Sequence, residues 1–421
     1  MYILGVNISH DSSTCLLKDG EIVYYSENER LTGDKAREED DKINIIKTFF
    51  NENKILPIYD HIESIKKYTK EIDYIIFSSY GSYRLDNEDK FIDDKILIRS
   101  IISKLSEENI KFNTSVFYEN NHHIYHAANA FYASGFQDSA ALIMDGGGSF
   151  DHDYFTNHTK KISDYPFREV ESIYTCSYDF PNFTSHYKVN SMLDDPFDET
   201  EEIFWKKTDN EIYTKSRSCG DIFNVIAQML DMGKDNSNGA GKLMGLSGHR
   251  LKTDKSIPMK LFDRSKIDQI IDQYETKHEM FLVEWFEKID DVYVTRNRLL
   301  SHINDFMKNN VRDKSLSKQN LDFYILASLA YKLQKETFLH TIRLIDKAIK
   351  ITGKNRIVLS GGYFMNCVNN FKYTQLFPQI EFFVDPIPHD GGTAIGAAKY
   401  FWYGLTKSKD KFQFENVYFG P

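Results

Sequence analysis

Cysteine is scarce in this chain of 421 residues. The four cysteines are far apart and form no Cys-x-x-Cys pair: Cys15, Cys176, Cys219 and Cys367. This spacing argues against a disulfide framework and against a cluster of cysteine metal ligands. It is typical of proteins in a reducing compartment, and we therefore expect a cytoplasmic location.

Long apolar runs and an excess of basic charge are also missing. No run approaches the roughly 18 apolar residues of a membrane-spanning helix, so we expect no membrane partner. The chain begins with the strand-like Tyr2-Ile3-Leu4-Gly5-Val6 and has no basic leader, so we expect no signal peptide. The 52 Lys and Arg residues against 62 Asp and Glu residues give a net charge of −10. This charge argues against a nucleic-acid partner, because such proteins usually present a basic surface.

The pattern of the remaining residues predicts an α/β protein. Strand-like and helical segments alternate, as where helical residues 321–351 lead into the strand-like Arg356-Ile357-Val358-Leu359-Ser360. This alternation predicts sheets with helices packed on their faces, and the length predicts two lobes of about 150 to 200 residues. We expect the following parts: an N-terminal lobe over residues 1–215 with a polar insertion, a C-terminal lobe over residues 216–405 with a helical insertion at about 262–312, and a boundary segment over residues 406–421.

The most distinctive stretch is His122-His123-Ile124-Tyr125-His126, which precedes an apolar strand that ends in Asp145-Gly146-Gly147-Gly148. Residues four apart lie on one face of a helix, so His122 and His126 can bind one metal ion while His123 points away. The strand end adds a carboxylate and glycine N–H groups, which suit a metal and a phosphate. Two surface histidines near an ordinary glycine turn are the alternative, which the combination of motifs disfavours.

Four short turns beside predicted strands repeat this chemistry in both halves of the chain. They are Asp11-Ser12-Ser13, Asp145-Gly146-Gly147-Gly148, Ser360-Gly361-Gly362 and Asp390-Gly391-Gly392. Such turns expose backbone N–H groups, and a helix that follows adds the positive end of its dipole. A nucleotide cleft between two lobes needs turns of this kind from both halves. In this respect the chain resembles the actin, hexokinase and Hsp70 superfamily, in which two ribonuclease-H-like lobes close around ATP.

Six longer motifs follow one another along nearly the whole chain. They begin with Ser9-His10-Asp11-Ser12-Ser13 and continue through residues 19–31, 122–132, 241–246, 359–370 and 388–398. In this order they resemble the O-carbamoyltransferases of nodulation-factor, cephalosporin and tobramycin biosynthesis, in particular their metal-binding transfer domain. The resemblance implies an enzyme with two ribonuclease-H-like lobes around a nucleotide cleft.

The resemblance also implies a mononuclear Fe(II) or Zn(II) site and a bound nucleotide, either ATP or carbamoyl-adenylate. The metal ligands would be His122, His126, Asp145 and Asp390, which leave room for a substrate oxygen. The nucleotide contacts would come from Gly146, Gly147, Gly361, Gly362 and Asn366. Lys242 is a further candidate for a phosphate or carbonyl contact, although a surface lysine is nearly as good an interpretation.

Three further residues are candidates for catalysis. His10 and Asp11 match the family's His-Asp-x-Ser turn, where a structural role is as well supported as a catalytic one. His123 could orient the acceptor or accept its proton, or it could be a packing residue. We favour activation of the acceptor by the metal over activation by His123, because a metal directly lowers the pKa of a bound hydroxyl group.

The implied reaction is transfer of a carbamoyl group from carbamoyl-adenylate, made from carbamoyl phosphate and ATP, to a hydroxyl group of a small-molecule acceptor. The alternatives are threonylcarbamoyl transfer to tRNA, a small-molecule kinase, and a regulatory pair of lobes without catalysis. Typical members carry a second domain that makes the carbamoyl-adenylate, after a boundary similar to Val417-Tyr418-Phe419-Gly420-Pro421. We therefore expect the intermediate to come from a further domain or a separate partner protein. The sequence leaves open the identity of the acceptor and whether the chain forms a homodimer.

Overall fold

The computed structural model describes residues 1–32, 58–79, 82–85, 90–113, 116–118, 121–149, 167–179, 182–192, 204–208, 211–214, 218–229, 232, 239–249, 318–412, 417 and 419. The helical insertion expected at about 262–312 lies outside these residues. The strands are β1 (Tyr2–Asn7), β2 (Ser13–Lys18), β3 (Glu21–Glu27), β4 (Glu71–Ile72), β5 (Tyr74–Ser78), β6 (Ser82–Leu85), β7 (Lys90–Asp93), β8 (Lys111–Phe112), β9 (Val116–Tyr118), β10 (Asp138–Met144), β11 (Phe167–Ser177), β12 (Phe183–Met192), β13 (Phe204–Thr208), β14 (Glu211–Thr214), β15 (Arg356–Ser360) and β16 (Glu381–Val384). The helices are α1 (Asn28–Thr32), α3 (Tyr59–Lys66), α4 (Asp94–Glu107), α5 (His122–Ser134), α7 (Cys219–Met229), α8 (Ala240–Leu246), α11 (Lys318–Thr352), α12 (Cys367–Leu376) and α13 (Thr393–Thr406), with short 3-10 helices η1 (Ser247–His249), η2 (Gly362–Met365) and η3 (Asp390–Gly392).

The first sheet has the strand order β3-β2-β1-β5-β9. Strand β2 runs antiparallel to β1 and β3, whereas β5 and β9 run parallel to β1. The turn between β2 and β3 uses Asp19 and Gly20, with φ angles of 52° and 92°. Positive φ at both central residues is the geometry that an Asp-Gly hairpin favours.

The second sheet has the strand order β13-β14-β12-β11-β10-β15-β16. Strand β11 is antiparallel to β10 and β12, and β15 and β16 are parallel to β10. Its strands β12-β11-β10-β15-β16 therefore repeat the order and the directions of the first sheet, and β14 and β13 extend one edge. Two sheets with this shared topology confirm the expected α/β fold with a pair of ribonuclease-H-like units.

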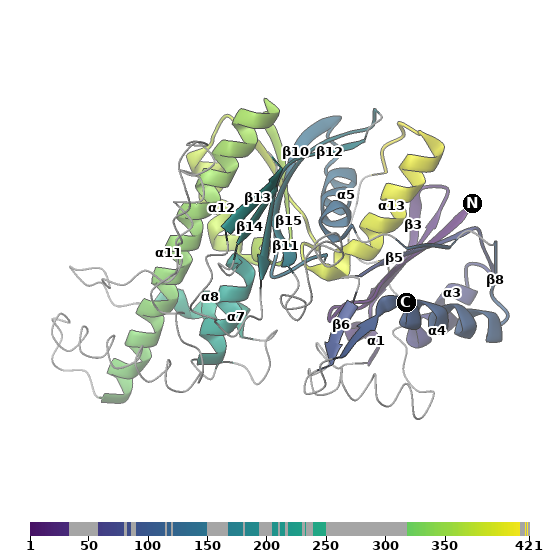
Figure 1. Cartoon of the computed structure of the whole chain (residues 1–421), viewed down its shortest axis with the longest axis horizontal. Coiled ribbons are helices and arrows are strands. Elements are labelled where there is room, and N and C mark those ends of the chain that lie inside the picture. The colour runs from purple at the N-terminus through teal and green to yellow at the C-terminus, as the bar shows by residue number, and fades with distance from the viewer. Residues whose placement is uncertain are drawn as a thin grey trace.

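Helices and sheets alternate as layers across the molecule (Figure 1). Helices α3 and α4 share an apolar cluster with the outer face of the first sheet. Helices α7, α8, α11 and α12 contribute to a cluster on the outer face of the second sheet. Between the two sheets lie α5 and α13, whose apolar side chains pack with those of both sheets in a third cluster.

Glycines allow helix α13 to pack very close to its neighbours. A Cβ atom on Gly5 of β1 would lie 2.1 Å from the carbonyl oxygen of Ala394. A Cβ atom on Gly396 of α13 would lie 1.9 Å from the carbonyl oxygen of Tyr125 in α5. Neither position has space for a larger residue, so the approach of α13 to β1 and to α5 depends on bare backbone at these points.

The change from one sheet to the other comes early in the chain. The first sheet ends with β9 at Tyr118, and the strands between Asp138 and Thr214 all pair within the second sheet. We propose a lobe boundary between Tyr118 and Asp138 in place of the one expected at residue 215.

None of the helices in the described parts of the chain combines the length and apolar character needed to cross a membrane.

Candidate metal centre

Helix α5 positions two imidazoles between the sheets. The helix begins at His122, whose backbone N–H donates to Ser149 Oγ at 3.0 Å, and it ends before Gly135, which caps it with a left-handed φ of 71°. His122 and His126 are one turn apart and fully buried, and their Nε2 atoms lie 3.1 Å from each other. Two ring nitrogens this close need a proton or a cation between them, because their lone pairs repel.

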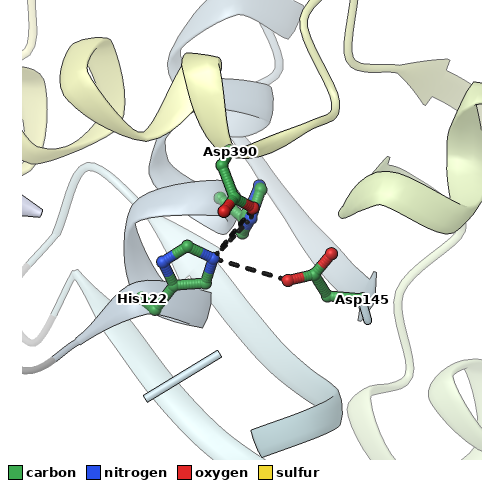
Figure 2. Close-up of side chains that lie close together, drawn as sticks. His122, Asp145 and Asp390 are labelled. Carbon is green, nitrogen blue, oxygen red and sulfur yellow. Dashed lines mark hydrogen bonds and ion pairs between the residues drawn. The ribbon is translucent and has the colours of Figure 1, made fainter. Parts of the chain in front are cut away.

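Two aspartates complete the group. Asp145 follows β10 directly, and Asp390 begins η3 at the start of α13. His122 Nε2 lies 3.4 Å from Asp145 Oδ2 and 3.2 Å from Asp390 Oδ1, as Figure 2 shows. One ligand atom of each of the four residues lies within 4.8 Å of the others. The structure therefore brings all four predicted ligands together, from segments far apart in the sequence.

The charges of these residues favour a divalent cation. Burial lowers the pKa of His122, but the carboxylates of Asp390 and Asp145 outweigh this effect and raise it to about 10. Burial acts to raise the pKa of both aspartates, and the neighbouring imidazoles nevertheless hold these values below the usual range. Two imidazoles and two carboxylates form a donor set that iron and zinc accept, and a cation would take the place of the His122 proton. The four residues fit the implied metal.

A buried polar network contacts His126 at Nδ1, the ring nitrogen that does not face the other predicted ligands. Its Nδ1 lies 3.3 Å from Ser360 Oγ, which donates to Asp385 Oδ2 at 2.7 Å. Asn129 Nδ2 donates to both oxygens of Asp385 at 3.0 Å, and the backbone N–H of Ile387 donates to Oδ1 at 2.9 Å. Burial raises the pKa of Asp385 to about 7, although these hydrogen bonds act to lower it. The network orients the ring so that Nε2 faces the other ligands.

A second group of acids and imidazoles forms the rim of the centre. His10 Nδ1 lies 3.5 Å from Asp390 Oδ2, and His10 Nε2 lies 3.3 Å from Asp11 Oδ2. His389 lies between Asp11 and Glu27, at 3.3 Å from each carboxylate. Burial lowers the pKa of His389, but hydrogen bonds and charge from these two carboxylates outweigh it and raise the value well above the usual one. Since the side chain of His10 is 32% exposed, the rim is open to a substrate.

His123 lies beside the four predicted metal ligands and faces another way. Its Nδ1 lies 2.7 Å from Ser172 Oγ, and its fully buried Nε2 has no hydrogen-bond partner among the described residues. A Cβ atom on Gly148 would lie 3.0 Å from this Nε2, so the ring packs against the glycine turn. Burial lowers the pKa of His123 to about 4, which keeps the ring neutral. The expectation that His123 points away from the other two imidazoles agrees with this arrangement.

The predicted glycine contacts lie at the ends of the central strands of the second sheet. Gly146 and Gly147 follow Asp145 and are half-buried. The backbone N–H of Gly362 donates to Asp145 Oδ1 at 3.1 Å, which ties the second glycine turn to a predicted ligand. Gly361 has a φ of 100°, and a Cβ atom there would lie 2.2 Å from a carbonyl oxygen of β10, so the fold itself requires this glycine. Nucleotide contacts by these glycines stay a prediction.

Asn366 and Lys242 occupy very different surroundings. Asn366 is buried and caps α12, since its Oδ1 accepts from the backbone N–H of Asn369 at 3.3 Å and from Gln334 Nε2 at 2.9 Å. Its Nδ2 has no hydrogen-bond partner in the described parts of the chain, so both N–H donors of this group are left for a ligand. Lys242 lies exposed on α8, and no contact with the four ligands is found among the described residues. A contact between Lys242 and a phosphate or carbonyl group stays a prediction.

Several residues around the centre had no predicted role. His389 was part of a recognised motif, and only its contacts with Asp11 and Glu27 show that it belongs to the rim. Asp385 follows β16 just as Asp145 follows β10, so an acidic residue after an apolar strand was a usable signal. Ser360 had been considered only as part of a glycine turn, and its link to His126 depends on tertiary contacts.

Residues 2–399 match the protein family described as "Carbamoyltransferase N-terminus". The chain belongs to this family. The resemblance inferred from the motifs is thereby confirmed over nearly the whole sequence. Two histidines and two aspartates therefore converge in a chain of the carbamoyltransferase family.

Two nodulation proteins are similar to this family member. Nodulation protein NolNO of Sinorhizobium fredii (strain NBRC 101917 / NGR234) is 24% identical over 425 aligned residues, which cover 98% of this chain and 49% of that protein. Nodulation protein NolO of Bradyrhizobium diazoefficiens (strain JCM 10833 / BCRC 13528 / IAM 13628 / NBRC 14792 / USDA 110) is 31% identical over 208 residues, which cover 47% of this chain and 34% of that protein. The chain thus spans about half the length of NolNO.

Solved structures show a partial similarity. Full-length HypF in the phosphate- and nucleotide-bound form has 15% identity and a TM-score of 0.48, with coverage of 96% of this chain and 56% of that one. The activator of the 2-hydroxyisocaproyl-CoA dehydratase from Clostridium difficile with bound ADPNP has 11% identity and a TM-score of 0.40, with coverage of 99% and 100%.

Proposed function

We propose that this chain carries the transfer site of a metal-dependent carbamoyltransferase. The proposed reaction moves a carbamoyl group from carbamoyl-adenylate to a hydroxyl group of a small-molecule acceptor. The observation that carries the proposal is the convergence of His122, His126, Asp145 and Asp390 within 4.8 Å, in a chain that matches a carbamoyltransferase family over residues 2–399.

In the proposed site, the buried ligands and the rim have different tasks. His122, His126, Asp145 and Asp390 would hold the Fe(II) or Zn(II) ion. When bound, such an ion polarises a carbonyl and lowers the pKa of a hydroxyl group. The half-exposed His10 and Asp11 are placed to contact the substrate.

The protein's backbone and buried donors would position the nucleotide. We assign the phosphate to the backbone N–H groups of Gly146 and Gly147, which follow the predicted ligand Asp145. Asn366 Nδ2 is a buried donor with no hydrogen-bond partner among the described residues, so it can bind an oxygen or nitrogen of the nucleotide. Holding the adenylate and the acceptor in one orientation lowers the entropic cost of the reaction.

Several finer points stay predictions. They are the carbamoyl-adenylate donor and its formation from carbamoyl phosphate and ATP, a further domain or partner that makes it, the identity of the metal, and the proton acceptor. The identity of the acceptor molecule, the formation of a homodimer and a cytoplasmic location are likewise predictions. The ring of His123 is packed inward, and burial lowers its pKa to about 4, which makes it a weak proton acceptor. Both features support the metal rather than His123 as the group that activates the acceptor.

The test compares metal content and ligand binding in the full chain and in His126→Ala. We expect the wild type to hold about one Fe or Zn ion per chain more than the variant, measured by inductively coupled plasma mass spectrometry. Isothermal calorimetry should show binding of carbamoyl-adenylate to the metal-loaded wild type and at least tenfold weaker binding to His126→Ala.

His186→Ala is the matched control, because His186 is a partly buried histidine of β12 that contacts Thr175. This variant should keep both the metal and the ligand. A wild-type protein that takes up neither Fe nor Zn and binds ATP with Mg²⁺ instead would overturn the proposal in favour of a kinase.

A further inference from the structure

A second group of potential metal ligands lies in the second lobe. Glu171 of β11, Cys219 at the start of α7 and His340 of α11 each place one ligand atom within 4.8 Å of the other two. Their exposed fractions are 1%, 1% and 3%, so all three lie in the protein interior. His340 Nε2 lies 2.9 Å from Glu171 Oε1.

This group is separated from the first centre by the sheet. Glu171 pairs across the ladder with Met144, whose side chain packs in the apolar cluster that contains residues of α7 and α11. The next residue, Ser172, points to the opposite face, where it contacts His123 in α5. Adjacent residues of a strand face opposite sides of a sheet, so Glu171 and Ser172 belong to different sites.

The surroundings make three ionisable groups at this position unusual. Cys219 belongs to a largely apolar cluster that includes Ile222, Phe223 and Leu333. Burying a carboxylate among such residues is costly unless it is paired or binds a metal. His340 is one partner for the carboxylate of Glu171. Cys219 adds a sulfur donor to the oxygen and nitrogen donors of these two residues.

We propose that Glu171, Cys219 and His340 form a second metal site, distinct from the centre between the sheets. A mixed set of one sulfur, one nitrogen and one oxygen donor suits Zn(II), which accepts all three ligand types. Binding would release the thiol proton of Cys219 and the proton shared by His340 and Glu171, and the cation would balance the two negative charges that result. Because the ligands come from a strand and two helices, the ion would fasten α7 and α11 to the second sheet.

Cobalt(II) provides a direct test, because thiolate ligation gives it a charge-transfer absorption in the near ultraviolet. The first centre has no sulfur donor, so of the two proposed sites only the one with Cys219 would give this band. The full chain is stripped with a chelator and titrated with Co(II). We expect about two Co(II) ions per wild-type chain, with the band present. Cys219→Ser should lose the band and one ion, whereas His126→Ala should lose one ion and keep the band.

Cys176→Ser is the matched control, because Cys176 is also fully buried and lies in the apolar cluster between the sheets. It should keep both the band and the stoichiometry. His340→Gln provides a second variant, and its affinity for the band-forming ion should fall at least tenfold. A wild type without the band at saturating Co(II), or a band that persists in Cys219→Ser, would overturn the proposal. Neither result would affect the metal at His126.

Discussion

The orientation of one imidazole depends on a single hydroxyl group. Ser360 Oγ lies between His126 Nδ1 and the buried carboxylate of Asp385. Partners behind a metal-binding histidine typically change metal affinity about 10- to 100-fold when removed. We therefore expect Ser360→Ala to weaken Fe(II) or Zn(II) binding by this factor in a metal titration, with the fold retained.

Ser139→Ala is the control for that change. Ser139 is equally buried, and its Oγ has no hydrogen-bond partner among the described residues. Its affinity for metal should equal that of the wild type. Equal affinities for Ser360→Ala and Ser139→Ala would show that the serine does not position the ligand.

His61 should make the stability of the first lobe depend on pH. It is buried between Tyr24, whose hydroxyl lies 2.8 Å from Nδ1, and Asn28, which contacts Nε2. Burial lowers its pKa from 6.5 to about 3. The unfolded chain therefore binds the proton first, and stability falls as the pH drops below about 6.5 towards 3.

At pH 5 this effect amounts to about 2 kcal/mol for His61. The measurement is urea unfolding of wild type and His61→Gln at pH 7 and pH 5. The variant should be less stable at pH 7, and the difference should shrink at pH 5 because only the wild type loses this contribution. Parallel curves at both pH values would contradict the prediction.

At the scale of elements, α13 is the helix on which both lobes depend. It packs on β1 through Gly5 and on α5 through Gly396. A methyl group at Gly396 would meet the carbonyl oxygen of Tyr125 at 1.9 Å, so Gly396→Ala must displace one of the two helices. Overpacking of this kind typically costs about 1 to 3 kcal/mol. Differential scanning calorimetry should show a lower melting temperature.

Gly404→Ala is the internal control, because Gly404 lies on the same helix and an added Cβ atom meets nothing within 4 Å. Alanine has the higher helix propensity, by up to about 1 kcal/mol. The control should therefore melt at the wild-type temperature or above it. If both variants melt alike, the close approach of α5 and α13 is not the reason for the glycine.

At the scale of the whole molecule, the proposed metal centre between the sheets joins segments that lie far apart in the chain. Its predicted ligands come from α5, the end of β10 and η3, and Asp390 is also held by the first sheet, since Asn7 Nδ2 donates to its carbonyl oxygen at 3.0 Å. A ligand that binds only the folded state stabilises it, by about 2.7 kcal/mol at 100 times its Kd.

Metal removal should therefore lower the melting temperature by a few degrees. We expect the wild-type melting temperature to rise with free Zn(II), and the rise to be smaller in His126→Ala because one site is lost. A melting temperature that does not respond to metal or chelator would show that the ligands do not bind an ion in the folded chain.

Features that depend on neighbours in the sequence could be predicted from it. The Asp19-Gly20 hairpin follows from residues that tolerate positive φ, and the pairing of His122 with His126 follows from the pitch of a helix. Asp145 after an apolar strand follows the same logic, whereas Asp390 could be added only through the family motif, because no local rule relates it to α5.

The sequence by itself therefore determined the α/β class and the family, and it predicted the four residues that meet between the sheets. Only the tertiary structure decided that the strands between Asp138 and Thr214 belong to the second sheet and that Lys242 is exposed. It also revealed the buried link from His126 through Ser360 to Asp385, and the meeting of Glu171, Cys219 and His340. The physical reason is the same in each case: periodicity records which face of an element is buried, but not which distant element covers it.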